Sequence, residues 1–140
     1  MLSGQPLSGL RILTFEAVGA GPFGSMYLAD LGAEVIKIEN HLTDGDATRS
    51  MGPHFLGPQD SHFFQCFNLN KKSVALNVKT PEGREIFHRL AAKADAVLNN
   101  LRGDQPEKLG LDYASLKDIN PAIVCAHPVS YTHLTLPTTP

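Results

Sequence analysis

The chain has 140 residues, of which 42% are hydrophobic and 19% are charged. That is enough apolar material for one α/β domain, and the chain is too short for most two-domain enzymes. The formal net charge of -2 and the lack of a long basic run argue against nucleic acid or an anionic membrane as a partner. No stretch approaches the roughly 20 apolar residues that span a bilayer, and the N-terminus has neither the basic start nor the apolar core of a secretory signal. We therefore expect a cytoplasmic domain that binds a small molecule.

Five apolar runs that favour strands alternate with segments of helical period. The predicted strands are Leu10–Phe15, Ala33–Glu39, Ser73–Val78, Asp95–Asn100 and Ala122–His127. Between the first two, apolar residues recur at helical spacing and a glycine supplies a stop; these are Phe23, Met26, Tyr27, Leu31 and Gly32. Two strands joined through a helix form a βαβ unit, whose strands run parallel. The order of segments therefore predicts an α/β fold with a parallel sheet.

Two further helical segments connect the later strands. Thr80 can cap a helix that has Pro81 in its first turn. The apolar stripe of this helix consists of Ile86, Phe87, Leu90, Ala91 and Ala94. The last connection, residues 104–121, is interrupted by Pro106 and Gly110, which predicts two short helical pieces.

The segment 40–72 shows neither a helical nor a strand period and is rich in Pro, Gly, His and Phe. Loops of this length in compact domains are usually functional covers or linkers. The stretch DGDATR within it contains Asp44, Asp46 and Arg49 but lacks the further ligands of a calcium loop. We expect a solvated turn closed by an Asp–Arg pair, and no metal site.

The stretch VGAGPFGS contains the pattern Gly-x-Gly-x-x-Gly at Gly19, Gly21 and Gly24, with Glu39 twenty residues after the first glycine. This spacing matches a dinucleotide-binding fingerprint. Pro22, however, removes one of the amide donors that such a loop directs at a pyrophosphate. The residues alone leave three interpretations open: an NAD(P) site, a purely structural turn, or a site for another phosphate-bearing ligand. Glu39 fits a capping or pairing group at the strand end better than a ribose ligand.

Several blocks of the chain, in order, are similar to one enzyme family. They are PLSGLRILTF, GAGPFGSMYLADLGAEVIKIE, NLNKKSVALNVKTPEGREIFHRLAAKADAVLNNLR and EKLGLDYASLKDINPAIV, which together run from about Pro6 to Ala126. They resemble the N-terminal part of the class III CoA-transferases, a group that includes formyl-CoA transferase, carnitine CoA-transferases and α-methylacyl-CoA racemases. The resemblance implies a Rossmann-like parallel sheet flanked by helices, as the N-terminal part of a large CoA-transferase domain within residues 1–128.

The resemblance also implies which residues contact coenzyme A. The turn at Val18, Gly19 and Ala20 would lie against the pantetheine and thioester end, where small residues let a ligand approach the backbone. The adenine and phosphate contacts would come from Leu76, Lys79, Asn100, Leu101 and Arg102, with Lys108 as a weaker candidate. The chain departs from the family pattern at Asn40 in place of an arginine, at Leu101 in place of an aromatic residue, and at Gly103 in place of a proline.

Catalysis in this family uses an aspartate that attacks an acyl-CoA thioester, so the resemblance implies acyl-CoA and an organic acid as substrates. That aspartate is expected beyond the end of this chain, and we expect no catalytic residue within it. The intact parent is expected to be an interlocked homodimer without a metal. Three alternatives remain: an α-methylacyl-CoA racemase, whose acid/base pair would also lie downstream; an NAD(P)-binding module; and a non-catalytic CoA-binding or dimerising domain.

The C-terminal residues and the cysteines give two smaller predictions. Residues 129–138 match the in-frame translation of a sequencing-library transposon adapter, so we expect 129–140 to be a disordered read-through artefact. Cys66 and Cys125 lie in apolar settings without metal-ligand spacing, and we expect two reduced, buried thiols.

Overall fold

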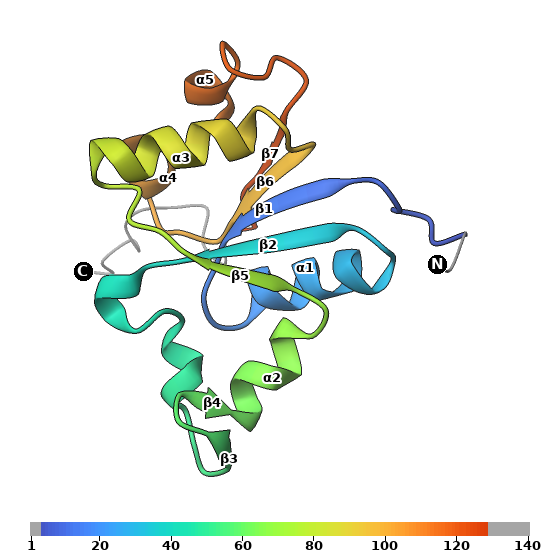
Figure 1. Ribbon diagram of the computed structural model, residues 1–140, viewed down its shortest axis with the longest axis vertical. Coiled ribbons are helices and arrows are strands. Elements are labelled where there is room, and N and C mark those ends of the chain that lie inside the picture. The colour runs from blue at the N-terminus through green and yellow to red at the C-terminus, as the bar shows by residue number, and fades with distance from the viewer. Residues whose placement is uncertain (1–3, 129–140) are drawn as a thin grey trace, which may run out of the picture.

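The computed structural model describes residues 4–128, which form a five-stranded sheet with helices on both faces (Figure 1). The strands lie in the order β5-β2-β1-β6-β7, and every neighbouring pair is parallel. Their bounds are β1 Arg11–Phe15, β2 Glu34–Glu39, β5 Lys72–Ala75, β6 Ala96–Asn99 and β7 Val124–Ala126. The predicted parallel α/β fold is confirmed. The predictions for 129–140 fall outside the described residues.

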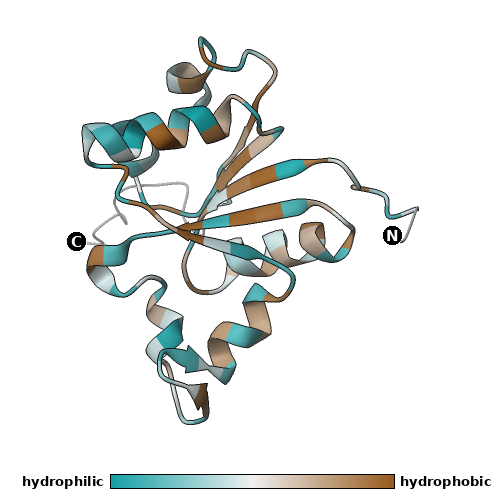
Figure 2. Cartoon of the chain, in the orientation of Figure 1, coloured by the Kyte–Doolittle hydropathy of each residue, from teal (hydrophilic) through white to brown (hydrophobic). Residues whose placement is uncertain are grey.

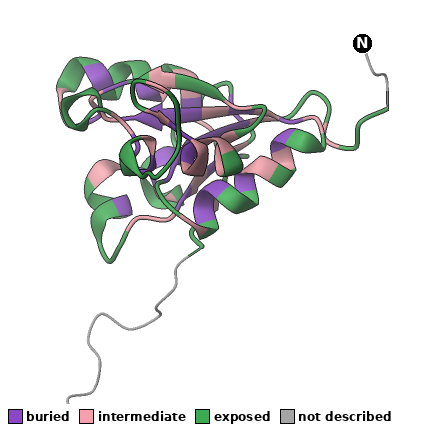
Figure 3. Cartoon of the chain, turned by 90° about the horizontal axis from the view of Figure 1, so that it is seen from below, coloured by how far each residue is buried: buried purple, intermediate pink, exposed green. Residues whose placement is uncertain are grey.

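The side chains of the central strand β1 alternate between the two faces of the sheet, as strand geometry requires. Leu13 and Phe15 pack on the side of helix α3 (Pro81–Ala91), where Phe87 meets Phe15 edge to face at 5.2 Å. Ile12 points to the opposite face and packs in a smaller cluster with Ala29 of helix α1 (Ala20–Asp30). Figure 2 shows the apolar strands between these layers, and Figure 3 shows that buried residues concentrate along them.

Helix α1 forms where helical spacing predicted it, but it buries a different face. Gly21, Pro22, Ser25 and Ala29 are buried, whereas Phe23 is 46% and Tyr27 is 51% exposed. Small residues on the inner face let the helix approach the sheet closely: a Cβ at Gly21 would lie 2.8 Å from the Asn100 side chain. The spacing of the apolar residues therefore predicted the helix correctly, but it did not predict which face of the helix is buried.

Helix α3 begins as its capping residues predicted. The Thr80 hydroxyl accepts a hydrogen bond from the Gly83 amide at 3.1 Å, and Pro81 occupies the first turn. The strand predicted over 73–78 ends earlier, at Ala75, because Asn77 makes a turn in which its side chain accepts from the Lys79 amide. Leu76 and Val78 remain buried although they have left the strand, which is why the apolar pattern extended the prediction.

The last connection contains two short helices, α4 (Gln105–Leu109) and α5 (Tyr113–Leu116), as predicted. Gly110 ends α4 with a φ of 71°, a backbone conformation that favours glycine. Leu111 and Leu116 are fully buried against the α3 side of the sheet.

The segment 40–72 is more regular than the sequence predicted. It contains two single-turn helices, His41–Thr43 and Ala47–Ser50, a small hairpin of β3 (Phe55–Gly57) and β4 (Asp60–Ser61), and helix α2 (His62–Asn68). The Ser61 hydroxyl caps α2 by accepting from the Phe64 amide at 3.0 Å. Helix α2 lies beside α1, on the face opposite α3 (Figure 1). Within residues 4–128, no helix has the length and apolar character needed to cross a membrane.

Candidate functional site

A cleft of about 240 Å³ opens at the carboxyl ends of the central strands. Phe15 and Glu16 lie at the end of β1, and Ile38 and Glu39 lie at the end of β2. The rest of the wall comes from Ala17 after β1, from residues 40, 45 and 46 after β2, from the turn after β5, from Leu101 after β6 and from α4. Ligands of open parallel α/β sheets bind at this edge, so the cleft is the candidate site.

Three of the predicted ligand contacts line this cleft: Leu76, Lys79 and Leu101. Leu76 is buried and Lys79 is exposed, so the wall offers an apolar surface beside a cation. A second hollow of about 390 Å³ is also bordered by Lys79, but its other lining residues all come from α3. The cleft joins several elements of the fold, and for that reason we regard it as the site.

The glycine-containing turn adjoins the cleft through Ala17, which lines it. Val18, Gly19 and Ala20 follow directly but do not line the cleft, and Val18 and Ala20 are exposed. Val18 has a φ of 51° and Gly19 a φ of 62°. A Cβ built at Gly19 would have no atom within 4 Å, so the backbone at this glycine is open to a neighbouring molecule.

The other three predicted contacts have different surroundings. The Asn100 side chain bonds to the turn itself: its Oδ1 accepts from the Ala17 amide at 3.1 Å, and its Nδ2 donates to the Ala17 carbonyl at 2.8 Å. Arg102 is exposed and does not line the cleft. Lys108 forms an exposed pair with Asp104 at 2.7 Å, and the hydrogen bond to that carboxylate raises the pKa of Lys108. The structure thus gathers Leu76, Lys79 and Leu101 and leaves Arg102 and Lys108 at the periphery.

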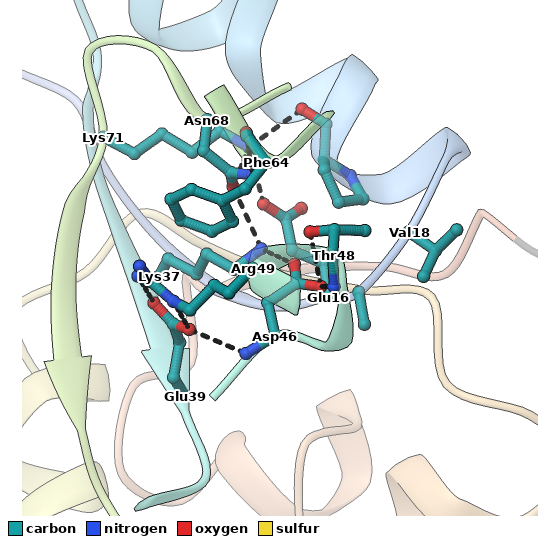
Figure 4. Close-up of polar contacts among 12 residues, drawn as sticks. Glu16, Val18, Lys37, Glu39, Asp46, Thr48, Arg49, Phe64, Asn68 and Lys71 are labelled. Carbon is teal, nitrogen blue, oxygen red and sulfur yellow. Dashed lines mark hydrogen bonds and ion pairs between the residues drawn. The ribbon is translucent and has the colours of Figure 1, made fainter. Parts of the chain in front are cut away.

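Three acids line the cleft, and each is paired with a cation (Figure 4). Glu16 pairs with Lys71 at 2.8 Å, Asp46 with Lys37 at 2.5 Å, and Glu39 with Arg49 at 2.7 Å. The side chains of the first two pairs are at most 2% exposed. Because these charges cancel, Lys79 is the one cation among the described lining residues that is left to face an anionic ligand.

Glu39 is fixed in its ionised form. Burial alone would raise its pKa, but hydrogen bonds from Arg49, from Ser73 and from the Asp46 amide outweigh burial and lower the pKa to about 2. Arg49 reaches both carboxylate oxygens, at 2.7 and 2.9 Å. With its oxygens occupied in this way, Glu39 acts as a pairing group at the strand end and is not free to bind a ribose.

The prediction that an Asp–Arg pair closes the turn at DGDATR is wrong, because Asp46 and Arg49 pair with other residues. Asp46 is buried, pairs with Lys37, and accepts from the Thr48 amide at 2.9 Å. Arg49 turns instead to Glu39 and lies over the Phe64 ring, 3.8 Å from its centroid. The prediction failed because it paired residues that are close in sequence, whereas both partners come from β2.

Sequence analysis missed Glu16, Lys37 and Lys71, which carry much of the charge behind the cleft. Lys37 lies in an apolar strand, and nothing in a strand pattern tells whether a single lysine faces solvent. The buried thiols are a further correction: Cys66 is exposed, and Cys125 is only partly buried. For Cys125, burial raises the thiol pKa.

Comparison with known proteins establishes the family. A family model described as CoA-transferase family III matches residues 7–134, and the chain therefore belongs to this family. It is 41% identical over 124 residues to a succinate–glutarate CoA-transferase of Agrobacterium fabrum, covering 85% of this chain and 31% of that protein. It is 42% identical over 120 residues to the human succinyl-CoA:glutarate CoA-transferase, covering 86% of this chain and 27% of that protein.

Solved structures agree with this assignment. A CAIB/BAIF family protein of Brucella suis matches with a TM-score of 0.78 and 40% identity, over 87% of this chain and 33% of that one. A Mycobacterium tuberculosis protein matches with a TM-score of 0.80 and 36% identity, over 91% of this chain and 35% of that one. The chain thus spans about a third or less of the length of the relatives it matches.

Proposed function

We propose that this chain forms the coenzyme A-binding part of a CoA-transferase, and that the whole protein moves CoA between an acyl-CoA and a carboxylic acid. The observation that carries the proposal is the cleft at the carboxyl ends of β1 and β2, in a chain of this family, with Lys79 facing it. CoA carries several phosphate charges, and a lysine is suited to meet them.

The attacking carboxylate is proposed to lie outside the described residues. A nucleophilic carboxylate must be free to reach the thioester carbon. The three acids that line the cleft are instead held in ion pairs by Lys37, Arg49 and Lys71. This pairing supports a role for the present chain in binding and leaves the chemistry to another part of the protein.

Relatives support a transferase over a racemase. Their names describe CoA transfer involving succinate, glutarate, oxalate and mesaconate. We accordingly propose a short carboxylic acid as the acceptor. The interlocked homodimer is likewise a proposal, supported by the exposed apolar side chains of Phe23 and Tyr27 on α1 and of Val124 on the edge strand β7. The cytoplasmic location stays a prediction.

A direct test is calorimetric titration of the 140-residue chain with CoA and with NAD. We expect CoA to bind more tightly, because the cleft offers a lysine for the CoA phosphates while Glu39 is unavailable to a ribose. Tighter binding of NAD would contradict the proposal and restore the dinucleotide interpretation of the glycine pattern.

The phosphate contact is tested with Lys79→Ala and the ligand pair CoA and dephospho-CoA. If Lys79 meets the 3′-phosphate, the variant should weaken CoA about ten- to a hundredfold and dephospho-CoA much less, since a charge-assisted hydrogen bond is worth about 1.5–3 kcal/mol. Lys93→Ala, at an exposed lysine that does not line the cleft, is the matched control. Equal losses for both ligands would place Lys79 elsewhere on the cofactor.

A further inference from the structure

The turn between β1 and α1 has a backbone that its sequence does not favour. Val18 adopts a φ of 51°, in the left-handed region where the Cβ of an L residue crowds the backbone. Val18 also has a branched Cβ, which makes this conformation rarer still. Such a conformation persists only where the surrounding structure enforces it.

The side chains of Asn100 and Lys71, which are distant from the turn in sequence, form hydrogen bonds with the residues of the turn. Asn100, after β6, bonds to the Ala17 amide and carbonyl and donates to the Val18 carbonyl at 3.3 Å. Lys71, between α2 and β5, donates to Glu16 Oε1 and to the Pro22 carbonyl, both at 2.8 Å. Glu16 and Pro22 stand on either side of Val18 in the chain, so the Lys71 ammonium group fixes both ends of the turn.

The Lys71–Glu16 pair is buried, with side-chain exposures of 2% and 0%. The Ser25 hydroxyl lies 2.7 and 2.9 Å from the two Glu16 oxygens and donates its one hydrogen to this carboxylate, which ties Glu16 to α1. A buried ion pair often adds no more folding stability than well-packed apolar residues of the same volume would. Because Lys71 also donates to the Pro22 carbonyl, its main effect is to fix the positions of Glu16 and Pro22 relative to each other. The geometry fixed here is that of a cleft wall, since Glu16 and Ala17 both line the cleft.

We propose that Lys71 is a positioning residue that holds the β1–α1 turn in its ligand-receiving shape through Glu16 and the Pro22 carbonyl. Lys71 lies near the end of segment 40–72, three residues after the end of α2. Asn68 of α2 accepts from Lys71 at 3.4 Å and from Lys37 at 3.0 Å. The segment 40–72 is thereby linked to the cleft wall. The ligand part of this inference rests on the proposed binding of coenzyme A.

The test compares Lys71→Met with Lys72→Met in the 140-residue chain. Lys72 is the next residue, but its pair with Glu34 lies at the surface, where the Lys72 side chain is 68% exposed. Amide hydrogen exchange is measured for residues 16–22, of which Pro22 has no amide hydrogen, and for α3. CoA affinity is measured by calorimetry. We expect Lys71→Met to speed exchange of 16–22 at least tenfold, to leave α3 unchanged, and to weaken CoA by about ten- to a hundredfold. Lys72→Met should change none of these.

Two further variants separate positioning from folding. Lys71→Arg keeps the charge and the donors and should recover most of the CoA affinity. If Lys71→Met does not fold, Glu16→Gln/Lys71→Met removes the uncompensated carboxylate and is measured in its place. A loss of protection in α3 as large as in 16–22 would indicate a purely structural role and would overturn the inference.

The outcomes also separate this inference from the proposed function. Wild-type chain that binds CoA, together with a Lys71→Met variant of equal affinity and equal exchange, overturns the inference alone. Wild-type chain that binds no CoA overturns the proposed function, and with it the ligand part of the inference. In that case the exchange of residues 16–22 still decides whether Lys71 holds the turn.

Discussion

The two faces of the sheet are stabilised by different means. On the α3 side, a continuous set of buried apolar residues from β1, β6, α3, α5 and the connecting turns fills the core. On the α1 side, the buried apolar cluster is confined to Ile12, Ala29, Ala33 and Val35. On this side, next to segment 40–72, the buried contacts are ion pairs instead: Glu16 with Lys71, and Asp46 with Lys37.

The two faces therefore differ in what they contribute to the folded chain. Apolar contacts are non-directional and tolerate small shifts, whereas a buried ion pair is stable only at good distances and angles. The α3 face can therefore supply most of the folding free energy, while the α1 face fixes the position of the groups around the cleft. Three experiments test this difference between the two faces.

The largest expected loss of stability comes from Phe87→Ala on the α3 face. Phe87 is fully buried and contacts the Phe15 ring, so its removal should leave a cavity and lower the unfolding free energy by about 4 kcal/mol in urea denaturation. Ile86→Ala, at the neighbouring position with 38% exposure, is the control and should cost clearly less. Equal losses for the two variants would mean that the α3 face is not the main core.

A somewhat smaller loss is expected from Lys37→Met on the α1 face. The variant leaves the buried Asp46 carboxylate without its cation, and we expect the unfolding free energy to fall by about 3 kcal/mol. Lys37→Met/Asp46→Asn removes both charges and should recover part of that loss. If the double variant is as unstable as the single one, the pair contributes more than the cancellation of a buried charge.

The third experiment concerns the pH dependence of the Glu39–Arg49 pair. The pKa of Glu39 is lowered from 4.5 to about 2 in the folded chain, so its contribution is fully present above about pH 4.5 and is lost as the pH falls through about 2. The difference in unfolding free energy between wild type and Glu39→Gln should therefore shrink across that range. Glu82→Gln, at an exposed carboxyl group in the first turn of α3, is the control. A difference that stays constant below pH 4 would contradict the assigned shift.

The α3 face could be predicted from sequence because its signals are local. Thr80 and Pro81 mark the start of α3, and its apolar residues repeat at helical spacing. The same reasoning failed for segment 40–72, although Ser61 stood before a run with Phe63, Phe64 and Phe67 at helical spacing. The whole segment was interpreted as aperiodic, so the cap in front of these aromatic residues was overlooked.

The candidate site was predictable only in part. The family resemblance named Leu76, Lys79 and Leu101, and these residues line the cleft at the carboxyl ends of the parallel strands, where ligands of such sheets bind. The ion pairs did not follow from any pattern. Glu16 and Lys71 are 55 residues apart, and only the folded chain brings them together. Asn100 could be named as a site residue, but its bonds to the turn became visible only in the structure.

The strand order also has a consequence for how the chain emerges from the ribosome. Strand β1 can pair with β2 once residue 39 has left the exit tunnel, but its other edge waits for β6 at residues 96–99. At about 5–20 residues per second, synthesis of the intervening stretch takes roughly 3 to 12 s. During that interval the unpaired edge of the most central strand is open to other nascent chains. We therefore expect the yield of soluble protein to depend on the speed of translation between β2 and β6.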